Sequence, residues 1–282
     1  MKRRRNFLRI LASGAVASRV AAPAKATNVP RAPAPAAAAG AGAKTGEAAP
    51  RGSPMLRKPI PSSGEPLPVI TGRLLEETGA RSRAFVATKV WTSGREAGIR
   101  QMEESFRLLR TKTIDLMQVH NLVDWRAHLP LLREWKAQGR IRYLGVTHYT
   151  SSAYPQLEQV LRSEALDFVQ LNYSIDDRTA EERILPLAAE RGIAVLVNRP
   201  FGGGGLLRSL SGRPLPAWAG ETGCESWAQA LLKFVVSHPS VNCAIPGTGN
   251  PAHMRANAQA GMGPMPDEAM RRRMIADAAA RK

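Results

Sequence analysis

Six short apolar segments, spaced along the chain like the strands of a repeated unit, limit most strongly what this sequence can fold into. Their apolar residues run continuously instead of alternating with polar ones, which is typical of strands buried on both faces of a parallel sheet. Helical patterns separate the segments, so the sequence predicts an α/β fold built from βα units. The segments are AFVATKV (84–90), IDLMQVH (114–120), YLGVTHY (143–149), DFVQLNYS (167–174), IAVLVNRP (193–200) and VNCAIPGT (241–248).

The stretches between these segments carry the signals of helices. In the stretch 98–111, GIRQMEESFRLLRT, apolar residues recur at helical spacing and define a face that packs on a core. In TAEERILPLAAERG, Thr179 and Glu182 have the spacing of a capping box, and Gly192 stands where the helix should end. The capping box predicts a helix that begins close to Thr179.

A polar residue stands at or near the end of every predicted strand. Because the carboxyl ends of parallel strands share one face, we expect these side chains to converge where a (β/α)8 barrel holds its active site. Six clear strands are present where a closed barrel needs eight. The sequence therefore predicts a (β/α)8 TIM barrel that is incomplete, with its first two strands largely missing. The polar residues are Lys89, His120, Thr147 with His148, Asn172, Asn198 with Arg199, and Thr248.

The segment after the last predicted strand favours a phosphate group. In IPGTGNPAHMRAN, a glycine-rich loop precedes Asn250, a helix N-cap, and Pro251, which suits the first helical position. Free backbone N–H groups at a helix start attract phosphate, and barrels commonly bind phosphate after their last strands. Arg199 and the Gly204–Gly205 pair, which follow the preceding strand, could complete such a site. The alternative is a loop that is merely flexible.

The motifs FVATKVW, DLMQVHN, YLGVTHY, FVQLNYS, VLVNRPF and CAIPGT resemble, in order and spacing, those of the aldo/keto reductase family, in particular its exported bacterial members. The resemblance covers the chain from about Met55 onward. It implies an NADP-dependent oxidoreductase, in which NADP(H) lies across the barrel mouth and hydride passes to a small aldehyde or ketone. The family's chemistry depends on a tetrad of Asp, Tyr, Lys and His.

The resemblance also assigns roles to individual residues. Lys89 matches the catalytic lysine, which lowers the pKa of the tyrosine hydroxyl, and His120 matches the histidine that orients the carbonyl oxygen. Asn198 stands where many members stack a tyrosine under the nicotinamide. Gly247 and His253 replace basic residues that many members use for the 2′-phosphate. The cofactor-binding positions implied are Thr147, His148, Gln170, Asn198, Arg199, Gly247, Thr248, His253 and Asn257.

The chain departs from the family upstream of Lys89. The segment 56–70 resembles the family's N-terminal hairpin and the start of its first strand, while 71–85 resembles the helix after its second strand. An internal deletion of the intervening part would remove the catalytic Asp and Tyr and impair activity. Tyr149 and Tyr173 follow strand ends and could approach the mouth in place of the lost tyrosine.

Two other readings of the chain stay open. One is a noncatalytic remnant of the family that binds a nucleotide or a partner. The other is a phosphate-handling barrel of a different family, which would explain the glycine-rich loop but not the strand-end lysine and histidine.

The N-terminus resembles a twin-arginine export signal. Arg4 and Arg5 precede a short apolar region, and Ala24-Lys25-Ala26 resembles a small-residue cleavage site, although Arg19 interrupts the apolar region. These features predict a signal peptide over residues 1–26, recognised by the twin-arginine export machinery, and a periplasmic or exported protein. Residues 27–56 are rich in Ala and Pro and predict a disordered linker. Residues 57–282 form the predicted barrel domain.

Charge and cysteine content exclude several classes of function. The net charge is +17, but nine basic residues and only Glu47 lie within the first 50 residues, so no basic surface for nucleic acid is indicated on the domain. The apolar region 10–17 is too short to span a bilayer. Cys224 and Cys243 lie in different predicted elements, and their spacing favours two buried thiols over a metal site or a redox pair.

Overall fold

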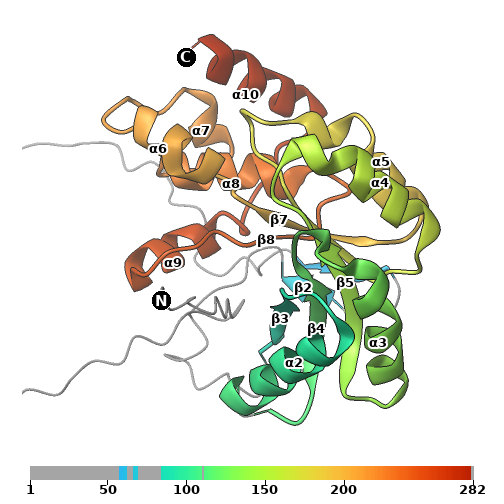
Figure 1. Cartoon of the computed structure of the whole chain (residues 1–282). Coiled ribbons are helices and arrows are strands. Elements are labelled where there is room, and N and C mark those ends of the chain that lie inside the picture. Colours follow the sequence, from blue (N-terminus) through green and yellow to red (C-terminus); the bar gives the residue numbers. More distant parts are fainter. Residues whose placement is uncertain (1–56, 62–65, 69–83, 110, 281–282) are drawn as a thin grey trace, which may run out of the picture.

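The computed structural model describes residues 57–61, 66–68, 84–109 and 111–280, drawn in colour in Figure 1. The predicted signal peptide (1–26) and linker (27–56) lie outside the described residues. So does the segment 69–83, which contains most of the region where the internal deletion is predicted.

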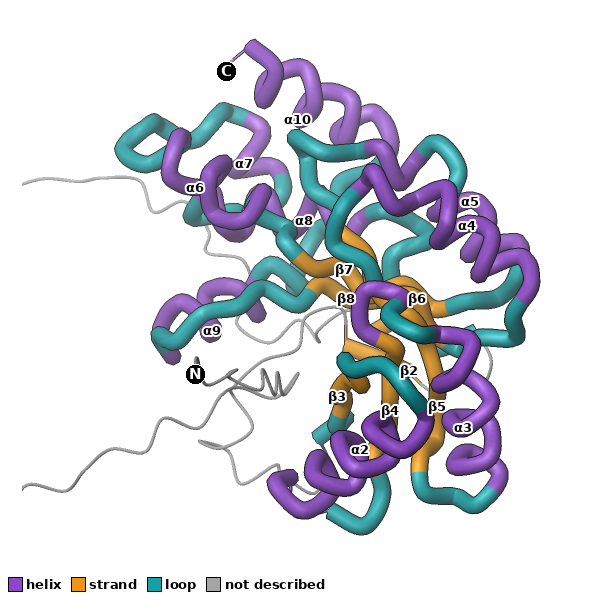
Figure 2. The backbone as a smooth tube through the Cα atoms, in the orientation of Figure 1, coloured by secondary structure: helices purple, strands orange, loops and turns teal. Residues whose placement is uncertain are grey.

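The six predicted strands form one fully parallel sheet in chain order. Figure 2 shows the strands side by side, with β3 and β8 at opposite ends of the row. Their continuous apolar runs explain the arrangement, since both faces of each strand are covered. The prediction of a parallel α/β fold is confirmed. The strands are β3 (Ala87–Val90), β4 (Ile114–Val119), β5 (Ile141–Thr147), β6 (Phe168–Asn172), β7 (Ala194–Asn198) and β8 (Cys243–Ala244).

Helices connect successive strands and cover the outer face of the sheet (Figure 1). The predicted amphipathic helix is present as α2, whose Met102 and Leu109 are buried against the core. None of the described helices has both the length and the apolarity needed to cross a membrane. The α-helices are α2 (Arg95–Leu109), α3 (Trp125–Ala137), α4 (Tyr154–Ser163), α5 (Ile184–Glu190), α6 (Gly205–Ser209), α7 (Trp218–Glu221), α8 (Trp227–Ser237), α9 (Pro251–Gln259) and α10 (Glu268–Ala280).

The predicted capping box before α5 is wrong. Thr179 begins a short 3-10 helix, η4 (Thr179–Glu181), and α5 starts only at Ile184, with no side chain capping either helix. The backbone N–H of Thr179 donates a hydrogen bond of 3.4 Å to a side-chain oxygen of Asp177, two residues earlier in the chain. In a capping box this N–H would bond to the side chain of Glu182, three residues later. The predicted helix end holds, because Gly192 has φ +63° two residues after α5.

Two apolar layers lie on the two faces of the sheet. The larger one fills the space between the sheet and the helices. The smaller one lies on the inner face, which is the side of the sheet turned away from the helices. It includes Ile60, which comes from the N-terminal hairpin. The buried inner-face residues are Ile60, Ala87, Leu116, Tyr143, Phe168, Ala194, Leu196 and Cys243.

The N-terminal hairpin resembles the expected one. It pairs β1 (Arg57–Pro59) with β2 (Pro66–Pro68) in antiparallel register. Lys58 anchors it, because its ammonium donates hydrogen bonds of 2.7–2.9 Å to three carbonyls at the end of α8 and the following turn. Ile60 then inserts into the inner apolar layer.

The barrel is open among the described elements. Within them, β3 pairs only with β4 and β8 only with β7, so the row of strands does not close on itself. The expectation of an incomplete TIM-type barrel is confirmed.

Candidate active site

The parallel strands deliver the predicted site residues to one edge of the sheet. Lys89 lies one residue before the end of β3, and His120 follows directly after β4. Thr147 and Asn198 are the last residues of β5 and β7, and Thr248 follows β8. Because all six strands run in the same direction, these residues share the carboxyl edge.

Polar residues follow the inner apolar layer on the same face, nearer the carboxyl edge of the sheet. The register pairs Lys89 with Gln118 and Thr147 with Gln170, while Asn198 pairs with Asn172. Thr147, Gln170 and Asn172 are buried at 1%, 5% and 7% exposure. Their polar side chains are thus held away from bulk water within the molecule.

Hydrogen bonds tie the loops after β4 and β5 together. The hydroxyl of Thr147 accepts a bond of 3.1 Å from the amide of Asn121, and the amide of His148 donates a bond of 3.0 Å to the carbonyl of Gln170. The His148 Nδ1 accepts a bond from the amide of Thr150. Burial lowers the pKa of His148, which favours the neutral ring at pH 7. This imidazole therefore offers hydrogen bonding without charge.

Backbone strain concentrates in the loops at this edge. Among the described residues, four that are not glycine have φ near +50°: Asn121, Leu122 and Asp124 after β4, and Arg199 after β7. Such conformations cost about 1–3 kcal/mol each and persist where the surrounding structure requires them, often at ligand sites. Asp124 illustrates the constraint, since its carboxylate accepts a bond of 2.6 Å from the amide of Gly94 in the loop after β3.

Buried polar atoms without hydrogen-bond partners lie on the same strands and loops. They are the Oε1 atom of Gln170, the Oδ1 atoms of Asn121 and Asn198, and both amide atoms of Gln118. A buried amide group left without a partner costs about 1–3 kcal/mol, so such groups call for a physical explanation. Several unsatisfied amides at one edge suit a ligand that both donates and accepts hydrogen bonds.

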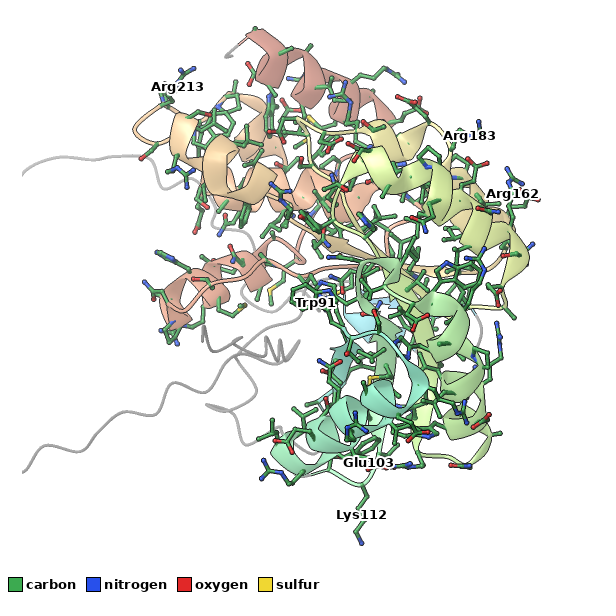
Figure 3. All side chains as sticks on the ribbon, in the orientation of Figure 1. Trp91, Glu103, Lys112, Arg162, Arg183 and Arg213 are labelled. Carbon is green, nitrogen blue, oxygen red and sulfur yellow. The ribbon has the colours of Figure 1, made fainter. Side chains whose placement is uncertain are left out.

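Aromatic rings flank the strand-end residues. Trp91, labelled in Figure 3, follows β3 and is 47% exposed, and its ring meets that of His120 edge-on at 5.1 Å. Tyr149 stacks on His148 at 5.9 Å, and the guanidinium of Arg199 lies 5.9 Å from the centre of the Tyr149 ring. The structure thus brings His148 and Arg199 together through a tyrosine that links β5 to β7.

Of the two tyrosines expected to approach the mouth, only Tyr149 is exposed there. Tyr173 is fully buried on the outer side of the sheet, where it stacks on Phe234 and bonds to Glu181 and Arg271. Burial raises the pKa of the Tyr173 hydroxyl. The expectation that Tyr173 could approach the mouth is therefore wrong, because its ring packs within the outer apolar layer.

The predicted phosphate loop and its helix lie next to β8. Asn250 caps α9 as expected, because its Oδ1 accepts a bond of 2.9 Å from the amide of Ala252. The Thr248 hydroxyl accepts a bond from the amide of Asn250, His253 is exposed, and Asn257 is buried. Gly247 opens the same loop. These residues occupy the carboxyl edge at the opposite end of the strand row from Lys89.

Sequence reasoning overlooked Gln118 and Trp91. Gln118 is the one polar residue within the apolar run LMQV and stands two residues before His120, so strand periodicity could have placed both on one face. Trp91 follows Lys89 by two residues. Its exposure depends on the loop conformation, for which the sequence carries no signal.

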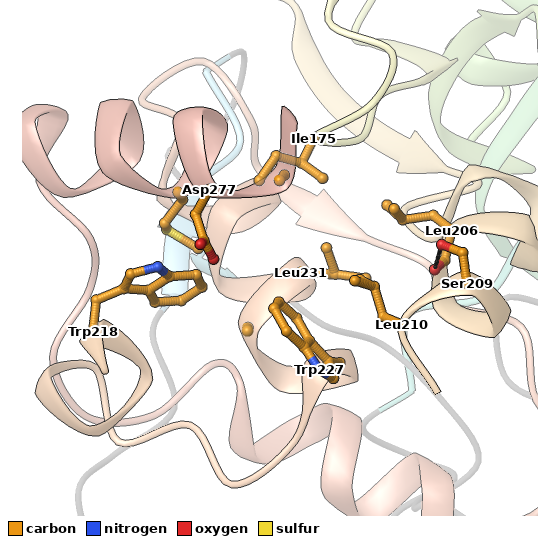
Figure 4. Close-up of a pocket in the computed structure, with 11 residues that line it drawn as sticks. Ile175, Leu206, Ser209, Leu210, Trp218, Trp227, Leu231 and Asp277 are labelled. Atoms are coloured by element: carbon orange, nitrogen blue, oxygen red, sulfur yellow. Dashed lines mark hydrogen bonds between the residues drawn. The ribbon is translucent and has the colours of Figure 1, made fainter. Parts of the chain in front are cut away.

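A small cavity lies elsewhere, among α6, α7, α8 and α10 (Figure 4). Its walls are mainly apolar, and they contain none of the predicted site residues. No group of three metal-ligating side chains occurs in the part of the chain that the structure describes. Strained backbone conformations, unsatisfied amide groups and polar strand-end residues are thus found together at the carboxyl edge of the sheet.

Fold and site together define a parallel, barrel-type α/β protein with a candidate ligand site at the carboxyl edge of its strands. The family model for the aldo/keto reductase family matches residues 63–276. The chain belongs to the aldo/keto reductase family.

Two proteins of similar sequence are named as reductases. Methylglyoxal reductase YeaE of Escherichia coli (strain K12) is 29% identical over 186 residues, which cover 64% of this chain and 65% of that protein. Aldo-keto reductase YhdN of Bacillus subtilis (strain 168) is 28% identical over 141 residues, covering 45% and 42%. The chain therefore spans less than two thirds of the length of either relative.

Solved structures of similar sequence share the fold. The holo form of aldo-keto reductase AKR11C1 from Bacillus halodurans has 27% identity and a TM-score of 0.56, over 71% of this chain and 73% of that one. An aldo/keto reductase from Klebsiella pneumoniae in complex with NADP and acetate has 25% identity and a TM-score of 0.58, over 70% and 71%.

Proposed function

We propose that this protein is an NADP-dependent oxidoreductase of the aldo/keto reductase type that reduces small aldehydes or ketones. The observation that carries the proposal is the pair of unsatisfied amide oxygens on adjacent strands, Gln170 Oε1 and Asn198 Oδ1. Family membership, the methylglyoxal reductase among the relatives and the NADP complex among the similar structures support it.

The residues present fit a nicotinamide cofactor. A carboxamide has N–H donors and a carbonyl acceptor, and the free oxygens of Gln170 and Asn198 are acceptors for such donors. The Thr147 hydroxyl and the neutral His148 ring add groups that can donate or accept. Arg199, which is exposed at the same edge, supplies a cation for the pyrophosphate.

The segment after β8 would hold the adenosine half. The glycine-rich loop with Gly247 and Thr248 leads into α9, where Asn250 already caps the Ala252 amide. We therefore propose that the backbone of the loop, with the amino end of α9 behind it, holds the phosphate oxygens. His253 and Asn257 follow on α9. The choice of NADP over NAD is part of the proposal.

Lys89 and His120 would act on the carbonyl oxygen of the substrate. The bound cofactor supplies the hydride. The His120 imidazolium would donate a hydrogen bond and then a proton to the oxygen as negative charge develops, which leaves a neutral imidazole, and the Lys89 ammonium would stabilise that charge. One bond forms at the carbonyl carbon and one at its oxygen, so the product is an alcohol.

The predicted loss of the family's Asp and Tyr leads us to expect a slow enzyme. A positioned general acid contributes about 10²- to 10⁴-fold in rate. Residues 69–83 contain no tyrosine that could replace the lost one. With His120 as the proton donor, turnover falls in that proportion below that of a complete member.

Titration of the full chain with NADPH, followed by fluorescence, tests the proposal. Methylglyoxal then serves as a reactive carbonyl substrate for turnover. We expect binding and turnover, with Gln170→Leu weakening binding and Lys89→Met or His120→Ala lowering turnover while binding persists. Absence of NADPH binding by the folded protein would contradict the proposal.

A noncatalytic remnant of the family is the second candidate. The open row of strands favours it, because β3 and β8 have no second strand neighbour among the described elements. It predicts NADPH binding without turnover, unaffected by Lys89→Met or His120→Ala.

We also propose that the protein is exported through the twin-arginine pathway to the periplasm. The support is the sequence motif alone, with Arg4 and Arg5 before the apolar region. Replacing Arg4 and Arg5 by lysine should retain the protein in the cytoplasm of an expressing bacterium. Equal periplasmic recovery of both forms after cell fractionation would contradict export by this route.

A further inference from the structure

The cavity among α6, α7, α8 and α10 lies apart from the candidate active site (Figure 4). The centre of a water-sized molecule has about 20 Å³ to move in there, which exceeds the roughly 10–15 Å³ that a single water fills. Most of the wall is apolar and includes Ile175, Leu206, Leu210, Leu231 and Met274. An occupant therefore needs a small apolar body.

The indole of Trp218 is a polar group that the cavity leaves unsatisfied. Trp218 lines the cavity and is only 6% exposed, and its Nε1 has no hydrogen-bond partner among the described residues. The neighbouring Trp227 differs, because its Nε1–H donates a bond of 3.0 Å to the carbonyl of Arg213. A buried indole N–H usually has an acceptor, so the Trp218 donor is one that a ligand can use.

A carboxylate lies on the wall of the same cavity. It belongs to Asp277 on α10, and Figure 4 shows it on the side of the cavity where the Trp218 indole lies. Its Oδ2 atom is buried. A carboxylate has about four lone pairs, so it can accept a further hydrogen bond whatever else it contacts. The cavity thus offers a donor and an acceptor within apolar surroundings.

A hydroxyl group complements both polar groups. Its oxygen can accept a bond from the Trp218 N–H while its own proton is donated to the Asp277 carboxylate. A carbonyl oxygen could accept from Trp218 but has no proton for Asp277. An ammonium could donate to Asp277 but has no lone pair for Trp218, and a second carboxylate would be repelled by the first. The pair therefore selects an alcohol among small polar molecules.

We propose that this cavity is a binding site for a small apolar alcohol, whose hydroxyl is held between Trp218 and Asp277. Leu206 and Leu210, on one wall, come from α6 and the residue that ends it, and α6 begins directly after the glycine turn Gly202–Gly204. An occupant therefore contacts the segment that follows β7 and its strand-end residues. The inference is independent of the proposed function, because the cavity contains none of the residues assigned to that reaction.

The test follows the indole N–H signals of the ¹⁵N-labelled full chain by NMR during titration with 2-butanol and, separately, with 2-butanone. The two probes share a carbon skeleton and differ in the O–H group. We expect 2-butanol to shift the Trp218 signal saturably and 2-butanone to bind about fivefold more weakly, the equivalent of one hydrogen bond. Trp218→Phe assigns the signal. An unsaturable Trp218 shift, equal shifts of every indole signal, or equal affinity for both probes would overturn the proposal.

Asp277→Asn tests the acceptor, because an amide donates as well as accepts. The amide N–H would bond to the ketone oxygen, so this variant should bind 2-butanone as tightly as 2-butanol. Glu268→Gln is the matched control, since it removes the same charge from α10 at an exposed position that pairs with Arg272. It should keep the preference for the alcohol. An unchanged preference in Asp277→Asn would contradict the role given to Asp277.

Ala278→Leu tests the place of binding. Ala278 lines the cavity, so a larger side chain there should fill it and abolish binding of both probes. If this variant does not fold, Trp218→Phe replaces it. Followed through the Trp227 signal on the same wall, Trp218→Phe should bind 2-butanol about fivefold more weakly. Unchanged 2-butanol affinity in a folded Ala278→Leu or Trp218→Phe variant would place the alcohol elsewhere and overturn the proposal.

Discussion

At the scale of single residues, the contact between Gly98 and His128 sets how closely α2 approaches α3. His128 is fully buried on α3, and its Nε2 lies 2.8 Å from the carbonyl oxygen of Thr92. A Cβ atom at Gly98 would lie 2.5 Å from His128 Cε1 and 2.7 Å from Nδ1. Two helices are thus held together where one of them has no side chain.

Gly98→Ala should therefore destabilise the protein. Overpacking costs about 1–3 kcal/mol, which exceeds the roughly 1 kcal/mol that alanine gains over glycine within a helix. Urea unfolding measures the difference. Gly220→Ala in α7 is the control, because a Cβ there meets nothing within 4 Å. Equal or higher stability of Gly98→Ala would show that His128 moves aside without cost.

His238 should make the protein sensitive to acid. Burial lowers its pKa to about 4, and Arg271 and Lys58 act in the same direction, whereas Glu181 opposes them. The ordinary value is about 6.5, so the unfolded chain binds more protons between pH 6.5 and 4. The free energy of unfolding should thus fall as the pH drops through that window.

Urea unfolding at pH 7 and at pH 4.5 tests this sensitivity. His238→Gln should reduce the difference between the two conditions. His253→Gln serves as the control, since His253 is exposed on α9. The same pH dependence in His238→Gln and the unmodified chain would assign the effect to other groups.

At the scale of elements, the N-terminal hairpin depends on one partly buried cation. The Lys58 ammonium donates to the carbonyls of Val236, His238 and Val241, which lie at the carboxyl end of α8 and in the turn beyond it. A helix carboxyl end carries partial negative charge and unsatisfied carbonyls, so a cation is favoured there. Lys58 therefore joins the hairpin to the far end of the chain.

Lys58→Met should destabilise the protein by about 1–3 kcal/mol, because it leaves three carbonyl groups with one donor fewer. Chemical denaturation measures the loss, and Lys112→Met on the exposed loop before β4 is the control. Limited proteolysis should cut the chain faster near the hairpin in Lys58→Met. Unchanged stability and proteolysis would mean that Ile60 alone fixes the hairpin.

The α5 region shows the limit of a local sequence pattern. Thr179 and Glu182 have the spacing of a capping box, yet Asp177 supplies the acceptor for the Thr179 amide. In a capping box the Thr179 amide would bond to the Glu182 side chain, so an aspartate two residues before that amide competes with Glu182 for it. The sequence contained both signals, and only the tertiary structure decides between them.

At the scale of the whole molecule, ligand binding should be visible as stability. A ligand that binds only the folded state adds about 2.7 kcal/mol at 100 times its dissociation constant. NADPH should therefore raise the melting temperature by a few degrees, and the double variant Gln170→Leu, Asn198→Leu should lose most of that shift. A full shift in the double variant would place the cofactor elsewhere.

The sequence predicted the strand order and the strand-end residues because burial on both faces leaves a strong signal in β4 to β7. The strand β8, which has only two residues, and the N-terminal hairpin left weaker signals in the sequence. The hairpin was indicated only by its resemblance to the hairpin of the aldo/keto reductase family. Tyr173 was misplaced because the parity of side chains beyond the end of β6 depends on the turn that follows. Gln118 was overlooked because buried strands can contain a single polar residue without any functional reason, so its presence in an apolar run did not by itself indicate a site.

The inner apolar layer, to which Ile60 belongs, has a consequence for the order in which reactants bind. Together with the other inner-face residues, Ile60 fills the amino end of the described sheet, so among the described strands the carboxyl edge is the route by which a solute reaches Lys89. Two reactants that share a single entrance bind sequentially, with the deeper one first. Steady-state measurements should then show compulsory-order inhibition patterns, in which the last molecule to leave competes with the first to arrive.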